Sequence, residues 1–406
     1  MTKAGIQSTQ PWTGHLRGSR AYRNLLLALL FGGLATFAQL YSVQAVLPGI
    51  AREFGIAPAD AALSVSAATL GLALAVVPWS WVADRAGRKR AMTWAIGAAV
   101  VFGLLLPLAP GFEAMLAVRF AEGAALGGIP GTALVYLNEE VQKVHAAVAA
   151  GTYVAGTTVG GLAGRLVAGP VAGLLDWRAG VLVVSIVAAV AAVLFVWLAP
   201  APRGFRPVMR GQGPSLARRI LANLRAPRQL GLYAQGFLLM GGFVAVYNYL
   251  GFRLEAPPFS LPATLVSLLF LAYLAGTVSS RLAGGLTVRF GRLPVLLAAV
   301  PVVLAGLAGT LVDSLPVILA GLVVFTGGFF GAHSVASGWT PRLADQGRAQ
   351  ASSLYNFFYY AGSSLLGWAG GLFFGLFGWT GVVLFAGGLA LLAGTAAVLT
   401  LRGAPG

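Results

Sequence analysis

Arg119 and Glu122 stand three residues apart in an apolar run, and this spacing puts both side chains on one face of a helix. Arg165 stands in a later apolar run that is rich in glycine. A charged side chain inside a membrane-spanning helix costs about 2.5 to 3.5 kcal/mol on insertion scales, so its default interpretation is functional. Glu122 is the first candidate for a group that takes up and releases a proton, with Arg119 as its partner. The alternative is a neutralised structural ion pair.

Uncharged polar and aromatic side chains in the apolar runs form a second set of candidates. Amide and aromatic groups that face a central cavity suit an amphipathic organic ligand. The residues predicted to line such a cavity are Gln39, Tyr41, Gln44, Arg165, Gln235, Tyr247, Asn248, His333, Tyr355, Asn356 and Tyr359. For a tyrosine near the end of a run the alternative is a place in the membrane interface, and for His333 it is a structural hydrogen bond.

The charges within the apolar runs restrict the kind of ligand that such a cavity would bind. Three arginines, Arg119, Arg165 and Arg281, face the single glutamate Glu122. A cavity with surplus positive charge favours an anionic, zwitterionic or neutral solute over a polycation.

The elements that must position these residues are membrane helices. Of the 406 residues, 58% are hydrophobic and 9% are charged, whereas an ordinary soluble domain has about 25% charged residues. Apolar runs long enough to cross a bilayer follow one another with short loops between them. We place them at 22–47, 61–83, 92–108, 113–136, 147–175, 179–199, 229–254, 263–287, 293–312, 316–339, 350–377 and 380–401. The sequence therefore predicts an all-α integral membrane protein with about twelve transmembrane helices.

The distribution of positive charge predicts the orientation of these helices. The formal net charge is +16, and most Lys and Arg residues fall in loops on one side, which the positive-inside rule assigns to the cytoplasm. We therefore expect both termini in the cytoplasm and no nucleic-acid partner. The predicted domains are a cytoplasmic tail (1–21), a six-helix bundle (22–199), a basic cytoplasmic linker (200–228), a second six-helix bundle (229–401) and a short tail (402–406).

Residues 216–225 of the linker have the spacing of a basic amphipathic helix that lies on the inner membrane surface. A solvated linker is the alternative.

The chain also contains an internal repeat. A shift of 202 residues places Gly160, Gly169, Gly173 and Trp177, in the predicted fifth span and just after it, on Gly362, Gly371, Gly375 and Trp379, in the eleventh and just after it. A shift of 204 residues places Arg85, Gly87 and Arg88 on Arg289, Gly291 and Arg292. Many transporters build a site between two related halves, so the repeat predicts two pseudo-symmetric six-helix bundles.

The loop after the second predicted span resembles the signature Gly-x-x-x-Asp-Arg-x-Gly-Arg-Lys of the major facilitator superfamily. It has Ser80 in place of the first glycine and then keeps Asp84, Arg85, Gly87, Arg88 and Lys89. The second copy has Gly284, Arg289, Gly291 and Arg292, with Val288 in place of the acid. The resemblance implies the fold of that superfamily and a loop that latches the inner face in the outward-open state. The alternative is that these cations only set the orientation.

Two further segments resemble signatures of proton-coupled members of this superfamily. The run Arg119-Phe-Ala-Glu122-Gly123 is similar to an Arg-x-x-x-Gly signature of the fourth helix. The fifth predicted span resembles a glycine-rich signature of antiporters, in which glycine permits close packing and proline bends the helix. Arg165 stands where that signature has proline. The predicted packing residues are Gly156, Gly160, Gly164, Gly169 and Pro170.

Together these features predict a secondary transporter that works by alternating access, by first choice a proton-coupled exporter (an antiporter) of a small organic molecule. The alternative is a proton-coupled importer or a uniporter of an organic anion. A membrane enzyme or sensor is a remote alternative, because the sequence has no clustered catalytic set.

The predicted partners are a small-molecule substrate and the lipid bilayer. With no Cys and three scattered His, the sequence predicts no metal site and no cofactor, with H+ as the coupling ion. We expect a monomer in the cell membrane of its source, which is the inner membrane in a bacterium.

Overall fold

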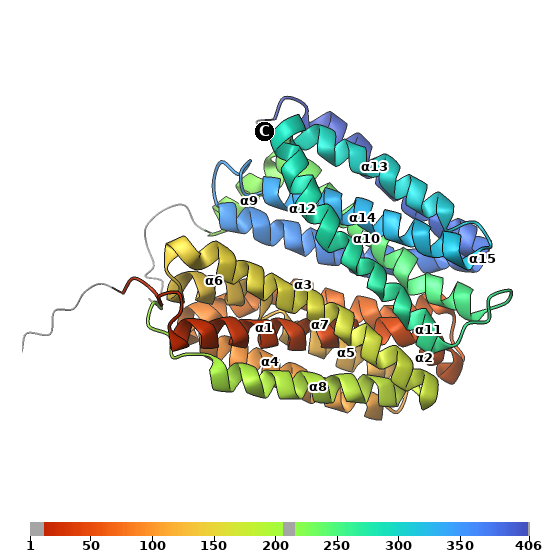
Figure 1. Ribbon diagram of the computed structural model, residues 1–406, viewed down its shortest axis with the longest axis horizontal. Helices are drawn as coiled ribbons and strands as arrows, with labels where there is room; N and C mark the ends of the chain where they lie inside the picture. The colour runs from red at the N-terminus through yellow and green to blue at the C-terminus, as the bar shows by residue number, and fades with distance from the viewer. Residues whose placement is uncertain (1–11, 206–215, 405–406) are drawn as a thin grey trace, which may run out of the picture.

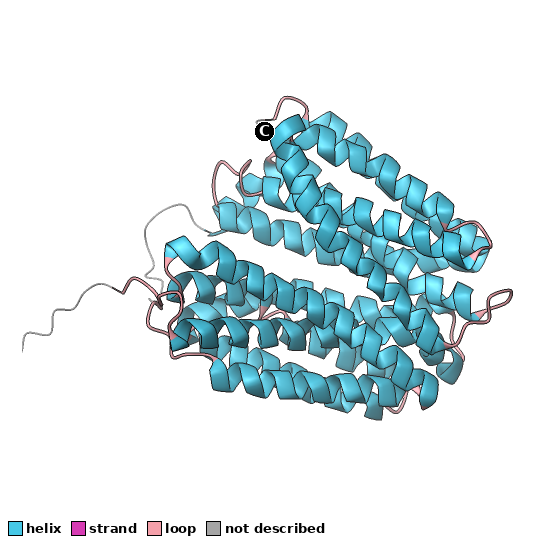
Figure 2. Ribbon diagram, in the orientation of Figure 1, coloured by secondary structure: helices cyan, strands magenta, loops and turns pink. Residues whose placement is uncertain are grey.

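The computed structural model describes residues 12–205 and 216–404. Its regular elements are helices (Figure 2), and a single bridge joins His15 to Val141. In lipid, every backbone N–H and C=O group must find its partner within the protein, and a helix provides those partners within one segment. The prediction of an all-α membrane protein is confirmed.

The described chain folds into two bundles (Figure 1). The first half contains α1 (Arg20–Tyr41), η1 (Ser42–Val46), α2 (Leu47–Phe54), α3 (Pro58–Ala86), α4 (Arg88–Leu105), η2 (Leu106–Leu108), α5 (Phe112–Leu126), α6 (Pro130–Glu140), η3 (Lys143–His145), α7 (Ala146–Leu174) and α8 (Trp177–Leu198). The second half contains α10 (Pro227–Glu255), α11 (Ala263–Ser267), η4 (Leu268–Ala272), α12 (Tyr273–Phe290), α13 (Arg292–Gly309), α14 (Leu315–Trp339) and α15 (Arg348–Leu401). Between them lies α9 (Leu216–Arg225), where the spacing predicts a helix.

These helices make twelve crossings. Nine segments of the described chain are long and apolar enough to cross a membrane. One of them, Arg348–Leu401, holds two crossings, because Gly378 has a left-handed φ of 60° and turns the chain between them. The other two crossings are the glycine-rich α7 and the pair α5 and α6, which residues 127–129 interrupt. The predicted number of transmembrane helices is thus confirmed.

Equivalent close contacts in the two halves support the repeat. A Cβ atom added to Gly160 would lie 2.5 Å from the carbonyl oxygen of Leu34, and one added to Gly362 would lie 2.0 Å from that of Phe237. In the two equivalent loops, Gly87 has a φ of 93° and Gly291 a φ of 82°, a region that favours glycine.

The glycines of α7 hold it against α1. Cβ atoms added to three of them would lie 2.3 to 2.5 Å from carbonyl oxygens of α1, in the pairs Gly156 with Leu30, Gly160 with Leu34 and Gly164 with Ala38. Only a helix face without side chains permits so close an approach. Gly169 lies further along α7 against Ser267 of α11, and Pro170 lies inside the helix.

The two halves are joined in the part of the bundle that lies away from the described termini (Figure 1). An ion pair of 2.6 Å connects Arg52 with Glu255, and the hydroxyls of Ser66 and Ser364 each donate to the other residue's carbonyl oxygen. The larger buried apolar cluster continues across this junction, whereas the smaller one is confined to the first half. The contacts that join the two halves therefore lie at the ends of the bundles opposite the described termini.

Candidate functional site

Arg119 and Glu122 form an ion pair inside the first half. Their side chains are 0% and 1% exposed, and Nη1 of Arg119 lies 2.6 Å from Oε2 of Glu122. The remaining contacts of the guanidinium are hydrogen bonds to three carbonyl oxygens, those of Ser64 at 3.0 Å, Gln39 at 3.1 Å and Leu40 at 2.6 Å. The charge of Arg119 is therefore balanced, and its hydrogen bonds hold the end of α1 against α3 and α5.

Arg165 is buried where the two halves meet, and it has no such partner. The residue is 2% exposed. Its Nε donates to Oε1 of Gln44 at 2.8 Å, Nη1 donates to the carbonyl of Gly161 at 2.6 Å, and Nη2 donates to the hydroxyl of Tyr273 at 3.3 Å. All 11 Asp and Glu residues lie in the described part of the chain, and none of them forms an ion pair with Arg165.

Aromatic rings from both halves surround this guanidinium. Its central carbon lies 4.3 Å from the ring centroid of Tyr41, 4.7 Å from that of Tyr273 and 4.9 Å from that of Phe270. The negative face of each ring attracts the cation. Such a contact contributes about 0.5 kcal/mol at an exposed site and about 2 kcal/mol at a desolvated one. The rings offset part of the cost of burying the charge, but they do not neutralise it.

A chain of amides carries the contact into the second half. Nε2 of Gln44 donates to Oδ1 of Asn248 at 2.7 Å, and Nδ2 of Asn248 is buried without a hydrogen-bond partner among the described residues. We call the residues Tyr41, Gln44, Arg165, Asn248, Phe270 and Tyr273 the Arg165 cluster.

A row of aromatic side chains extends the cluster within the second half. Ring centroids lie 5.3 Å apart for Tyr273 and Phe243, 4.0 Å for Phe243 and Phe329, 5.9 Å for Phe329 and His333, and 4.8 Å for His333 and Tyr359. Three helices, α10, α14 and α15, contribute to the row, which we call the aromatic wall and which comprises Phe243, Phe329, Phe330, His333 and Tyr359.

The structure brings most of the predicted cavity residues to this region. Tyr355 bonds Nδ1 of His333 through its hydroxyl at 2.9 Å, and Tyr247 bonds Thr326 at 2.7 Å while its ring packs against Phe270 and Tyr273. Three predicted residues lie elsewhere. Gln39 belongs to the surroundings of Arg119, Gln235 bonds the carbonyl of Ala393 within the second half, and Asn356 is exposed and forms no hydrogen bond with the described residues.

Sequence reasoning missed the phenylalanines of the cluster and of the wall. In an apolar run a phenylalanine that lines a site and one that fills a core have the same pattern, so only the density of aromatic residues in the runs around 243, 270 and 330 could have pointed to them.

The predicted gating loop is tied to its own half. Arg88 forms ion pairs with Asp84 and, at 3.1 Å, with Glu139 at the end of α6. Lys89 bonds the carbonyl of Ala199, and Arg85 lies over the ring of Trp81. The latch role stays a prediction, since the ion pairs and hydrogen bonds of Arg88 and Lys89 lie within the first half.

The second copy of the loop lacks these ion pairs. Arg289 lies over the ring of Phe290, and neither it nor Arg292 pairs with any of the 11 acidic residues, all of which are described. Val288, 89% exposed, occupies the position of the missing acid.

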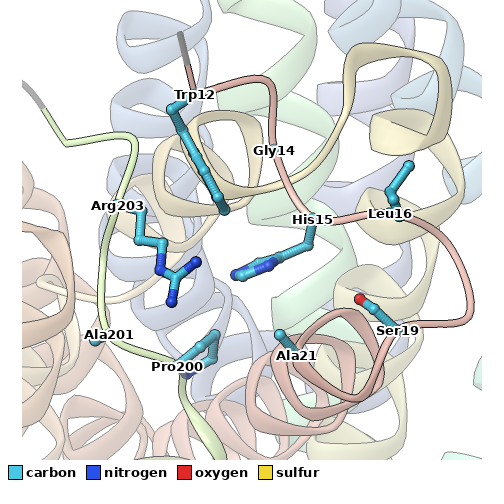
Figure 3. A pocket seen from close by; sticks show the side chains of 9 residues that line it. All are labelled: Trp12, Gly14, His15, Leu16, Ser19, Ala21, Pro200, Ala201 and Arg203. Carbon is cyan, nitrogen blue, oxygen red and sulfur yellow. The ribbon is translucent and has the colours of Figure 1, made fainter. Parts of the chain in front are cut away.

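Next to the gating loop, the N-terminal segment and the linker meet at the end of α6. Oε1 of Glu140 accepts hydrogen bonds from the backbone N–H groups of Arg203 and Gly204, both at 2.7 Å, and the carbonyl of Glu140 accepts one from the N–H of His15. A cavity of about 360 Å³ lies beside Trp12, His15 and Arg203 (Figure 3). Burial and the neighbouring Arg203 lower the pKa of His15.

Sequence reasoning missed this assembly. Two adjacent acids, Glu139 and Glu140, on an otherwise basic side of the membrane were the available signal.

No group of three His, Cys, Asp or Glu side chains in the described ranges could hold a metal ion. The site is thus made of arginine, amides and aromatic rings.

Comparison with known proteins gives a consistent result. Residues 29–281 match the family model described as Major Facilitator Superfamily. The inner membrane transport protein YnfM of Escherichia coli (strain K12) is 41% identical over 387 residues, which cover 93% of this chain and 91% of that protein. The uncharacterized MFS-type transporter YybF of Bacillus subtilis (strain 168) is 37% identical over 367 residues, which cover 90% of this chain and 91% of that protein.

Among solved structures, a bacterial homologue of the human lysosomal transporter Spinster, in an inward-facing and unoccupied conformation, has a TM-score of 0.77 at 17% identity. The match covers 96% of this chain and 99% of that one. At this identity the likeness shows the fold alone.

Proposed function

The chain belongs to the Major Facilitator Superfamily of secondary transporters, and on that premise we propose that it carries a small organic anion across the cell membrane. It is a multi-pass membrane transporter and not an enzyme. The single observation that carries the proposal is the position of Arg165, a buried cation between the halves without a carboxylate partner. In alternating access the halves rock about a site between them, so a ligand held there is exposed to each side in turn.

The energetics of Arg165 favour an anion. An ion taken out of water costs several kcal/mol unless a charge of opposite sign accompanies it. A guanidinium has five N–H donors in a planar fork that matches a carboxylate, and Arg165 uses three of them in the hydrogen bonds described above. The remaining donors are available to an anionic group of the substrate.

We further propose that Glu122 is the group that carries the coupling proton. Protonation removes the charge that balances Arg119, and Arg119 holds the carbonyl oxygens of Gln39 and Leu40. Within the next four residues of the chain, Tyr41 and Gln44 contact Arg165. A six-residue segment, 39–44, therefore connects the proton site with the anion site, and a shift in this segment is how one site would influence the other.

Export by proton antiport is the first choice of direction. A membrane potential that is negative inside drives a monovalent anion outward with about 2.3 kcal/mol per 100 mV. The resemblance of α7 to the antiporter signature supports the same direction. Import of an anion against this membrane potential needs a further driving force such as proton symport. The second candidate is therefore a proton-coupled importer of an organic anion, or else a uniporter.

Several accompanying features belong to the same proposal. Both termini lie in the cytoplasm, the cell membrane of a bacterium is the location, and the working unit is a monomer. The loop from Asp84 to Lys89 latches the inner face with its second copy when the outer side opens.

Transport into proteoliposomes tests the proposal. The full-length protein would be reconstituted, and uptake of radiolabelled acetate, hexanoate and benzoate would be measured with and without an imposed pH gradient. We expect flux of at least one of these anions that responds to the gradient and falls about a hundredfold in Arg165→Ala, because charge-assisted hydrogen bonds are lost. Arg225→Ala in α9 is the matched control and should transport normally.

Two results would count against the proposal. Equal flux in Arg165→Ala and the parent protein would contradict an anion site at Arg165. A flux that does not change with the pH gradient would contradict proton coupling.

A further inference from the structure

We propose that the transported anion is an aromatic monocarboxylate, bound with its carboxylate on Arg165 and its ring against the aromatic wall. This inference rests on the proposed function and names the substrate class of that same site.

The charge of the site argues for a single carboxylate. Arg165 is the one cation of the Arg165 cluster, and it forms no ion pair with the acidic residues of the chain, all of which are described. Arg119 already has Glu122, and Arg281 is exposed on α12, two helical turns beyond Tyr273. One negative charge therefore neutralises the cluster, whereas a dianion would bring a second charge without a partner, which is costly in a buried place.

The surroundings of Arg165 argue for an aromatic ring. The guanidinium contacts Phe270 and Tyr273 of the second half, and ring contacts then continue without interruption from Tyr273 to Tyr359. Offset and edge-to-face contacts between rings at 4.5 to 7 Å are favourable beyond the area they bury. An aliphatic anion of the same size would bury similar area without this additional attraction.

Exposure separates the lining of the site from its support. Phe243 and Phe329 are 2% exposed and form the packed interior of the wall. Tyr273, His333 and Tyr359 are only half-buried, although each contacts several other rings. Tyr273 lies where the two halves meet, since the guanidinium of Arg165 lies against both its ring and that of Tyr41 of the first half. A substrate ring would therefore lie against these half-buried members.

Two polar atoms remain for a substituent on the ring. The hydroxyl of Tyr359 has no hydrogen bond within the described chain, and His333 uses Nδ1 for Tyr355, which leaves Nε2 without one. A hydrogen-bonding substituent on the ring, away from its carboxylate, would satisfy these atoms.

A panel of four probes tests the inference on the full-length protein in lipid nanodiscs. Benzoate carries the ring and the charge, cyclohexanecarboxylate the charge without the aromatic ring, benzyl alcohol the ring without the charge, and phthalate a second charge. We expect benzoate to bind about three- to tenfold more tightly than cyclohexanecarboxylate, as measured by calorimetry, and the other two probes to bind more weakly still.

Variants of Tyr359 identify the contribution of the wall. Tyr359→Leu should reduce the preference for benzoate over cyclohexanecarboxylate to about onefold to twofold, whereas Tyr359→Phe, which keeps the ring, should retain the preference. Phe357→Leu, an exposed position on the same helix, is the matched control and should behave as the parent protein.

The outcomes separate this inference from the proposed function. Equal binding of benzoate and cyclohexanecarboxylate, both lost in Arg165→Ala, would overturn the aromatic class and keep the anion site. Binding of benzyl alcohol as tight as that of benzoate, unchanged in Arg165→Ala, would overturn the anion site itself. Should Tyr359→Leu fail to fold, the ratio of the two carboxylates on the parent protein still decides the question.

Discussion

Arg119 and Arg165 are both buried in membrane-spanning helices of the first half, yet their surroundings differ in one decisive respect. Arg119 has a carboxylate at 2.6 Å and three backbone carbonyls, all within its own half. Arg165 has amide, hydroxyl and aromatic partners from both halves and no carboxylate. Burial of a charge thus does not by itself define a role, because the partner of the charge decides whether the group is neutralised within the protein or left for a ligand.

The largest expected effect is a difference in stability between variants of the two arginines. Arg119→Ala leaves Glu122 buried without its partner, so the free energy of unfolding should fall by about 3 to 5 kcal/mol. Arg165→Ala leaves no carboxylate behind and should lower stability far less. Thermal unfolding of both variants in detergent measures the difference, and an equal loss of stability in the two would contradict the assignment of Arg165 as uncompensated.

A second substitution gives Arg165 a carboxylate partner like that of Arg119. Gln44→Glu would place a carboxylate 2.8 Å from Nε of Arg165, where the amide oxygen now lies. The new ion pair should compete with the substrate and weaken anion binding about a hundredfold, because charge-assisted hydrogen bonds contribute about 1.5 to 3 kcal/mol each. Calorimetric titration with benzoate measures the change.

Gln44→Ala is the control for that experiment, since it removes the same amide without adding charge. It should weaken binding only about fivefold, the loss expected for a neutral hydrogen bond. Equal effects of the two variants would show that the shape of the side chain matters and its charge does not.

A third substitution tests whether Glu122 carries the coupling proton. Glu122→Gln keeps an acceptor for Arg119 but can no longer release a proton. A gradient of one pH unit supplies about 1.4 kcal/mol per proton, or about tenfold in accumulation, and this response should disappear while benzoate binding persists. Flux in proteoliposomes at several gradients tests it, with Glu113→Gln, an exposed acid on the same helix, as the control. A variant that still follows the gradient would place the proton elsewhere.

The smallest effect concerns a third arginine, which is paired at the junction of the halves. Arg52 and Glu255 connect the halves with side-chain exposures of 66% and 11%. An ion pair this exposed contributes about 0.2 to 1 kcal/mol and is screened by salt, so Arg52→Ala should favour outward opening only about two- to fivefold.

The chain has no Cys, so a single thiol introduced as Ala263→Cys beside this pair reports the opening through maleimide labelling. Arg178→Ala, which breaks a pair with Glu53 inside the first half, should leave the labelling rate unchanged.

Much of the fold was predictable from local sequence. Apolar runs longer than the bilayer is thick require helices, because lipid offers no hydrogen bonds to the backbone. The loop with Gly87 and its copy with Gly291 were likewise predictable, since a left-handed backbone favours glycine. Two boundaries differ from expectation. The first span continues to Phe54 through η1 and α2, and the fourth is broken at 127–129, because contacts with other helices and not hydropathy fix such interruptions.

The candidate site was predictable in part. A charge in an apolar run is visible in any sequence, so Arg119, Glu122 and Arg165 were identified, and the spacing of three residues predicted the contact between the first two. That Asn356 is exposed, while Asn248 bonds Gln44 some 204 positions away in the chain, depends on which side of each helix faces the other half. Hydropathy carries little information about this rotation, since lipid and the protein interior are both apolar.

The sequence by itself determined that this protein is a membrane bundle of two related halves with three charges deep in its first half. Only the tertiary structure decided that Arg165 has no charged partner. An ion pair between residues three apart forms within one helix, whereas the surroundings of Arg165 result from the packing of α1, η1, α7, η4 and α12, which brings an amide and rings to the guanidinium and no acid. Local spacing fixes the first kind of contact, and long-range packing alone fixes the second.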